Sequence, residues 1–99
     1  MNQELINRIF KVAETEPKSR EQLIIKLMEE VGEVSQAHLS MVKASGSQYK
    51  ELTDEDFQEE LVDTILVTLT LLKKTGITNE ELTNLLTKKI NKWESKQGK

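Results

Sequence analysis

Apolar residues recur three and four positions apart along most of the chain, a pattern typical of helices that bury one side. The first such segment covers about residues 2–14 and ends at Thr15-Glu16-Pro17, because proline disfavours helix in the residue before it. A second helix is predicted over about 18–43, since Pro17 can occupy the first turn of the helix that follows. Its apolar side consists of Leu23, Leu27, Val31, Val34, His38 and Met41.

A loop is expected from Ala44 to Leu52, and a third helix after it. Thr53 can cap this helix, and three acidic residues in its first turn favour the helix dipole. The helix is apolar on nearly all sides, which predicts burial on nearly all sides. We expect one face to form the core of the chain, namely Leu61, Val62, Ile65, Leu66, Leu69 and Leu72. Val67 and Leu71 lie on the other side, near Glu60 and Asp63, and are expected to be buried against a partner subunit or a neighbouring helix.

The fourth helix begins at Thr78, where Glu81 three residues later completes a capping box. Lys73, Lys74 and Gly76 end the helix before it. The apolar positions of the fourth helix are Leu82, Leu85, Leu86, Ile90 and Trp93. No segment has the alternation of a strand. The prediction is therefore an all-α fold, a single domain over residues 1–99 built as a four-helix bundle-like unit.

The composition narrows the class of protein further. With 99 residues and no cysteine, disulfides, zinc-thiolate sites and cysteine nucleophiles are excluded. A net charge of −3 argues against binding to a nucleic-acid polymer. No apolar run has the length of a membrane span, and the first residues do not resemble a signal peptide, so we expect a cytoplasmic protein. The hydrophobic fraction of 36% is low, which favours a homo-oligomer, a dimer or a dimer of dimers.

Two short acidic patterns are candidates for a metal-binding site. Residues 29–33 read E-E-x-x-E and residues 60–63 read E-x-x-D. Residues three apart share one side of a helix, so Glu30 pairs with Glu33 and Glu60 with Asp63. Antiparallel packing of the two helices would bring these four carboxylates together, and such oxygen-only clusters suit Mg²⁺ or Mn²⁺. The alternative for each pattern alone is a solvated helix face, as for the further E-x-x-D at residues 51–54, interpreted as loop and helix cap.

Together the two patterns resemble the MazG-like all-α nucleoside triphosphate pyrophosphohydrolases, over about residues 20–95. The resemblance implies a helical unit that works as a dimer or larger assembly. It also implies Mg²⁺-dependent cleavage of a nucleoside triphosphate between its α- and β-phosphates, in the service of nucleotide-pool house-cleaning. Matched residue by residue, the metal ligands are Glu30, Glu33, Glu60 and Asp63. Glu29 takes the position that orients or deprotonates the attacking water.

Basic residues supply candidate phosphate contacts. Lys89, Lys92 and Lys96 recur at helical spacing where the family often carries such residues, although Trp93 stands where many members have an asparagine. Their alternative is a solvated basic end that favours the helix dipole. Lys26, one turn before Glu30, is either an ion-pair partner within the helix or a phosphate ligand.

Two other functions remain open on the sequence alone. One is a phosphoribosyl-ATP pyrophosphohydrolase, which shares the acidic patterns but has an extended segment before the first of them. The other is a non-catalytic helical module that keeps the acidic site for metal binding or assembly. Three further residues have structural interpretations: Phe10 as helix core, His38 as a core or interface histidine, and Trp93 as an anchor between helices or subunits.

Overall fold

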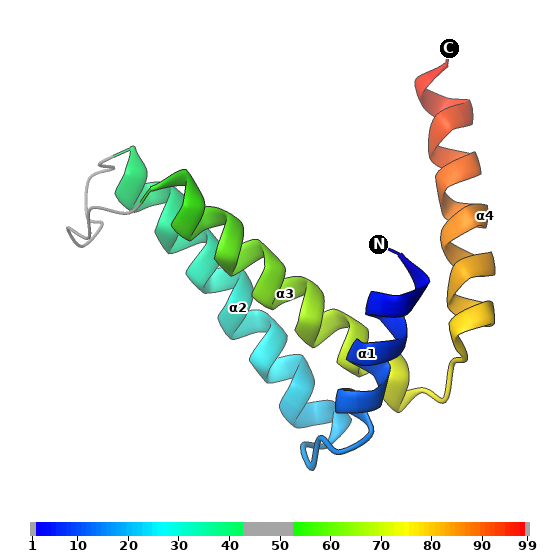
Figure 1. The fold of residues 1–99 in the computed structure, drawn as a ribbon. Coiled ribbons are helices and arrows are strands. Elements are labelled where there is room, and N and C mark those ends of the chain that lie inside the picture. Colours follow the sequence, from blue (N-terminus) through cyan, green and yellow to red (C-terminus); the bar gives the residue numbers. More distant parts are fainter. Residues whose placement is uncertain (1, 43–52, 99) are drawn as a thin grey trace.

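The computed structural model describes residues 2–42 and 53–98. Within these ranges it contains four helices and no strand, which confirms the all-α prediction (Figure 1). The helices are α1 (Gln3–Ala13), α2 (Arg20–Met41), α3 (Asp54–Lys74) and α4 (Asn79–Gln97). The expected loop at 44–52 and the expected helix end at Lys43 lie outside the described residues. None of the helices described is long and apolar enough to cross a membrane.

Local capping sets where the helices begin. Thr53 caps α3 and Thr78 caps α4, each in a reciprocal capping box, with Asp56 and Glu81 respectively. The beginning of α2 differs from the prediction, because Ser19 and Gln22 form a third capping box there. Pro17 therefore lies before the helix and not in its first turn. The end of α3 is as predicted, with Gly76 in the left-handed region at φ +87°.

Helices α2 and α3 form an antiparallel pair (Figure 1). The pair is tied at the end where α2 begins and α3 ends. The Lys74 ammonium donates to the Glu16 carbonyl oxygen over 2.6 Å, and the Arg20 guanidinium donates to the Lys74 carbonyl oxygen over 3.4 Å. This pairing fixes which turns of the two helices lie opposite each other.

The side of α2 that is buried differs from the predicted stripe at two positions. Val31 is 53% exposed and His38 is also exposed, whereas Glu30 and Ala37 are buried. The buried stripe is therefore rotated by one residue in the middle of the helix, and a carboxylate lies within it. The His38 ring contacts the ring of Phe57, at a centroid distance of 6.0 Å, from an exposed position.

The buried side of α3 differs from the prediction at four positions, whereas Leu69 and Leu72 of the expected core face do lie in the core. Glu60, Thr64, Val67 and Leu71 recur on one side of the helix, and Glu60 lies beside Glu30 of α2. This side is half-buried within the chain. Four members of the expected core face are instead 41–51% exposed: Leu61, Val62, Ile65 and Leu66. A helix that is apolar all round does not itself determine which side meets its neighbour.

A small core joins α1, α3 and α4. It consists of Ile6, Phe10, Leu69 and Leu82, with Ile9, Leu72 and Ile77 packed against it. Phe10 is only 3% exposed, which confirms its role in the core. The Lys73 ammonium lies 5.5 Å from the centre of its ring, a cation–π contact that closes one side of this core.

Helix α4 leaves the other helices after its first turns (Figure 1). Asn79 and Thr83 bond to Asn7 and Gln3 of α1, and Leu82 is the one buried residue that the structure describes in this helix. Trp93 is 64% exposed, so in the described part of the chain it is not buried between helices. The radius of gyration is 16.2 Å, against about 13 Å for a compact domain of this length. The chain alone therefore does not close a four-helix bundle.

Candidate metal centre

Three carboxylates converge between the middle turns of α2 and α3. Glu30, Glu60 and Asp63 each place one carboxylate oxygen within 4.8 Å of the other two. Glu60 and Asp63 share a side of α3 because they are three residues apart, and the antiparallel pairing brings Glu30 opposite them. The convergence expected from the two acidic patterns is thus found for these three residues.

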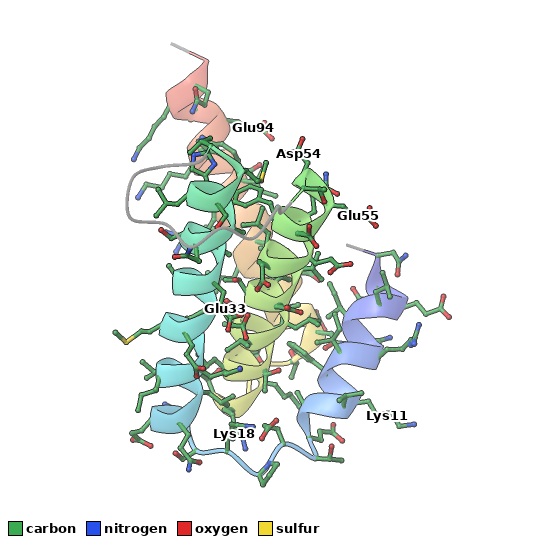
Figure 2. All side chains as sticks on the ribbon, turned by 90° about the vertical axis from the view of Figure 1, so that its left-hand side faces the viewer. Lys11, Lys18, Glu33, Asp54, Glu55 and Glu94 are labelled. Atoms are coloured by element: carbon green, nitrogen blue, oxygen red, sulfur yellow. The ribbon has the colours of Figure 1, made fainter. Side chains whose placement is uncertain are left out.

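Glu33 lies beside this cluster, on α2 where it borders α3 (Figure 2). Its side chain is exposed, and its carboxyl group is close enough to Glu60 to affect the pKa of that residue. The pKa of Glu60 is raised by burial, then by the hydrogen bond and negative charge of Glu33, and further by the charges of Asp63 and Glu30. Several carboxyl groups of like charge therefore lie close together between α2 and α3 at neutral pH.

Two oxygens in the cluster are buried and lack a hydrogen-bond donor among the described residues: Oε2 of Glu30 and Oε2 of Glu60. Glu30 is 5% exposed, and only its other oxygen is paired, 3.1 Å from the Lys26 ammonium. The Thr64 hydroxyl lies one turn from Glu60 but donates to the Glu60 backbone carbonyl over 2.9 Å. Buried acceptors without a donor are costly, so these oxygens point to a cation as the missing partner.

The donor set suits a hard divalent cation. The Lys26 ammonium pairs with Glu30, and the pKa of Lys26 is raised by this hydrogen bond and by the charges of Glu29, Glu30 and Glu33. All the donors are oxygens, as Mg²⁺ and Mn²⁺ prefer, and no histidine or cysteine belongs to the cluster that the described residues form. The residues present therefore fit Mg²⁺.

The other predicted site residues are Glu29, on the same helix as Glu30, and three lysines on α4. Glu29 is exposed on α2, and it lies near enough to Lys26 to raise the pKa of that ammonium. Lys89, Lys92 and Lys96 are exposed on α4, which packs on α1 and makes no backbone approach to α2 or α3. Within one chain, therefore, the structure does not bring these three lysines to the carboxylates.

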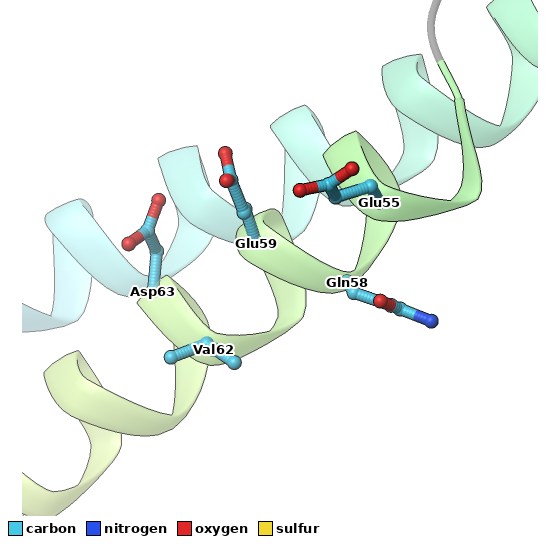
Figure 3. A pocket seen from close by; sticks show the side chains of 5 residues that line it. All are labelled: Glu55, Gln58, Glu59, Val62 and Asp63. Atoms are coloured by element: carbon cyan, nitrogen blue, oxygen red, sulfur yellow. The ribbon is translucent and has the colours of Figure 1, made fainter.

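An acidic hollow, which the sequence analysis did not identify, adjoins the cluster on α3. Glu55, Glu59 and Asp63 follow one another at intervals of one turn, with their carboxylates on the same side of the helix (Figure 3). With Gln58 and Val62 they line a hollow of about 420 Å³. The i, i+4, i+8 spacing of the three acidic residues is the signal that could have found it. Asp63 belongs to both the hollow and the cluster, so the hollow opens beside the carboxylate cluster.

Comparison of the chain with protein-family models, with curated proteins and with solved structures finds no match.

Proposed function

We propose that this chain is a Mg²⁺-dependent nucleoside triphosphate pyrophosphohydrolase that acts as a homodimer in the cytoplasmic nucleotide pool. The observation that carries the proposal is the pair of buried, unpartnered oxygens of Glu30 and Glu60, with Asp63 beside them. These two carboxylates and the exposed Asp63, on two helices, would form a centre that binds a cation. The resemblance of both acidic patterns to the MazG-like enzymes supports the choice of substrate.

The reaction adds one water to the α-phosphorus and breaks the bond from that phosphorus to the bridging oxygen of the β-phosphate. The products are a nucleoside monophosphate and pyrophosphate. Bound Mg²⁺ would neutralise the triphosphate and stabilise the charge that develops on its oxygens. Glu30, Glu33, Glu60 and Asp63 would hold the ion. Glu29, exposed on the same helix, would orient the attacking water or accept its proton.

A homodimer is supported by the balance of buried and exposed apolar residues. Among the described residues, sixteen large hydrophobic side chains are exposed, whereas seven hydrophobic residues are buried. Several of the exposed side chains, among them Val62, Ile65 and Leu66, line one groove, and contiguous apolar surface is typical of an interaction surface. A second copy of the chain would cover part of it.

A panel of nucleoside triphosphates, assayed with Mg²⁺, tests the function directly. The expected products are the monophosphate and pyrophosphate, and Glu60→Gln should release neither. Asp54→Asn is the matched control, because Asp54 lies in the first turn of α3 as an exposed helix-dipole residue. Release of inorganic phosphate and a diphosphate would contradict the proposed bond cleavage. Phosphoribosyl-ATP belongs in the panel as the substrate of the related alternative.

A non-catalytic metal-binding module is the second candidate. It is favoured by the position of Lys89, Lys92 and Lys96 on α4, because among the described residues Lys26 is the ammonium that pairs with a carboxylate of the cluster. Calorimetric titration separates the two functions. Mg²⁺ binding that is lost in Glu60→Gln, together with no pyrophosphate from any substrate in the panel, would identify the module.

A further inference from the structure

One side of α4 is apolar and uncovered, and the same helix is basic. Leu85, Leu86 and Ile90 are 43–46% exposed and Trp93 is 64% exposed. Four exposed lysines accompany them, at positions 88, 89, 92 and 96. A helix with this composition needs a surface that is both apolar and acidic.

The chain has an apolar surface of matching type between α1 and α3. A groove of about 550 Å³ lies there, lined by Leu5, Ile9 and Val12 of α1 and by Val62, Ile65 and Leu66 of α3. Arg8 and Thr70 complete its walls. Nothing in the described part of the chain fills this groove, because α4 is directed away from it (Figure 1).

The groove continues into the acidic hollow. Val62 lines both, so the apolar wall and the carboxylates of Glu55, Glu59 and Asp63 are adjacent along α3. The groove is therefore apolar apart from Arg8 and Thr70, and the hollow that adjoins it is negative. The charge of the hollow is opposite to that of α4, and the apolar part of the groove matches the uncovered side of that helix.

We propose that α4 of a second copy of this chain docks in the groove between α1 and α3, with its lysines over the acidic hollow. A two-fold axis makes the contact reciprocal, so that each copy gives its α4 and receives the other. Since Asp63 belongs to the metal centre, the lysines of one copy then lie beside the carboxylates of the other. Each centre gains the phosphate-contacting groups that its own chain does not bring to it, and this last step alone rests on the proposed function.

Cross-linking between copies tests the docking, and the absence of native cysteine makes it specific. Ile65→Cys, in the groove, is mixed with ¹⁵N-labelled Leu86→Cys or Ile90→Cys, so that mixed and self-paired dimers differ in mass. Mild oxidation should give the mixed disulfide with at least one α4 variant. Met28→Cys is the control, because Met28 is 69% exposed on α2, outside the groove. Equal cross-linking from Met28, or none from Ile65, would overturn the proposal.

Charge reversal tests the orientation. Glu55→Lys/Glu59→Lys should raise the dimer dissociation constant at least tenfold in sedimentation experiments. Mixing this variant with Lys89→Glu/Lys92→Glu should restore association, because the two opposite reversals then face each other. A wild-type chain that is monomeric at micromolar concentration would refute the docking. So would a monomer whose single tryptophan, Trp93, shifts its fluorescence only with anionic phosphatidylglycerol vesicles, since α4 would then serve a membrane surface.

These measurements do not require activity, so the two proposals fail separately. Mixed cross-links without pyrophosphate release would remove the function and keep the docking. Pyrophosphate release by a monomer would keep the reaction and remove both the docking and the homodimer.

Discussion

The Lys26 ammonium lies 3.1 Å from Oε1 of Glu30, one turn away on α2, and leaves Oε2 of that carboxylate without a partner among the described residues. The ion pair thus satisfies one oxygen of a buried carboxylate that lies beside Glu60 and Asp63. Of the two interpretations of Lys26 from the sequence, the structure shows the ion pair.

Removal of Lys26 should strengthen Mg²⁺ binding. Lys26→Gln removes the ammonium that pairs with Glu30, so the metal-free protein should melt at a lower temperature and bind Mg²⁺ about two- to fivefold more tightly. Calorimetric titration measures this, with Lys11→Gln on the outer side of α1 as the control (Figure 2). A raised KM with unchanged Mg²⁺ affinity would make Lys26 a phosphate ligand instead.

The carboxylates should act as a unit. Glu30→Gln, Glu33→Gln, Glu60→Gln and Asp63→Asn should each remove most activity and leave the helical circular-dichroism spectrum intact. Because groups that hold one ion give non-additive losses, Glu33→Gln/Asp63→Asn should be little worse than either single variant. Near-full activity in any single variant would exclude that residue from the ligand set.

Glu60 should make the metal-free protein less stable as the pH rises. Its pKa in the folded chain lies above the ordinary value of 4.5, chiefly because of burial and of Glu33. The contribution of Glu60 to stability is therefore fully present below the ordinary pKa and is lost as the pH rises through the raised pKa of the folded chain. In EDTA, the melting temperature of Glu60→Gln should rise relative to that of the wild type as the pH increases from about 4 to 7.

Glu81 provides the control of opposite sign for this measurement. The backbone N–H of Thr78 lowers the pKa of Glu81, so its contribution is present above the ordinary pKa and is lost as the pH falls. Glu81→Gln should therefore lose stability relative to the wild type as the pH rises over the same range. A constant offset for Glu60→Gln at all pH values would contradict the environment described for Glu60.

Mg²⁺ should stabilise the fold. An ion that binds only the native state adds about 2.7 kcal/mol at a hundredfold excess over its dissociation constant. Thermal melts with EDTA and with millimolar Mg²⁺ should differ for the wild type and coincide for Glu60→Gln. No difference for the wild type would count against a centre that is formed before the nucleotide binds.

The two sides of α3 should respond differently to an added charge. Leu71 lies on the half-buried side, so Leu71→Glu should lower the free energy of unfolding by about 2–4 kcal/mol, through burial of an unpaired carboxylate. Ile65 is 44% exposed in the single chain, so Ile65→Glu should leave its secondary structure intact and weaken the dimer. Urea unfolding and light scattering separate the two effects. Equal loss of stability in both variants would contradict the assignment of the two sides.

The sequence predicts the parts of this structure that depend on neighbouring residues. Thr53 and Thr78 cap their helices because their hydroxyls reach backbone N–H groups of the same turn, and Gly76 adopts a backbone angle that suits glycine. The pairing of Glu60 with Asp63 follows from helical spacing alone. These features need no knowledge of how the helices pack.

The packing itself could not be predicted in the same way. A pattern of apolar residues puts Val31 inside and Glu30 at the margin, because burial of a carboxylate is costly. The structure buries Glu30 between two helices, where Lys26 and a cation can offset that cost. Apolar residues on every side of α3 also leave its contact side undetermined, and nothing in the periodicity of α4 shows that it departs from the other helices.

The corner between α3 and α4 bears on the conformational entropy that the proposed docking of α4 would cost. Residues 75–78 are held at both ends, by the Thr75 hydroxyl on the Leu72 carbonyl, by the left-handed Gly76 and by the Thr78 capping box. The direction of α4 is therefore set before any partner arrives. A second copy would bind a helix that is already folded and oriented, so the chain would lose little conformational entropy on binding.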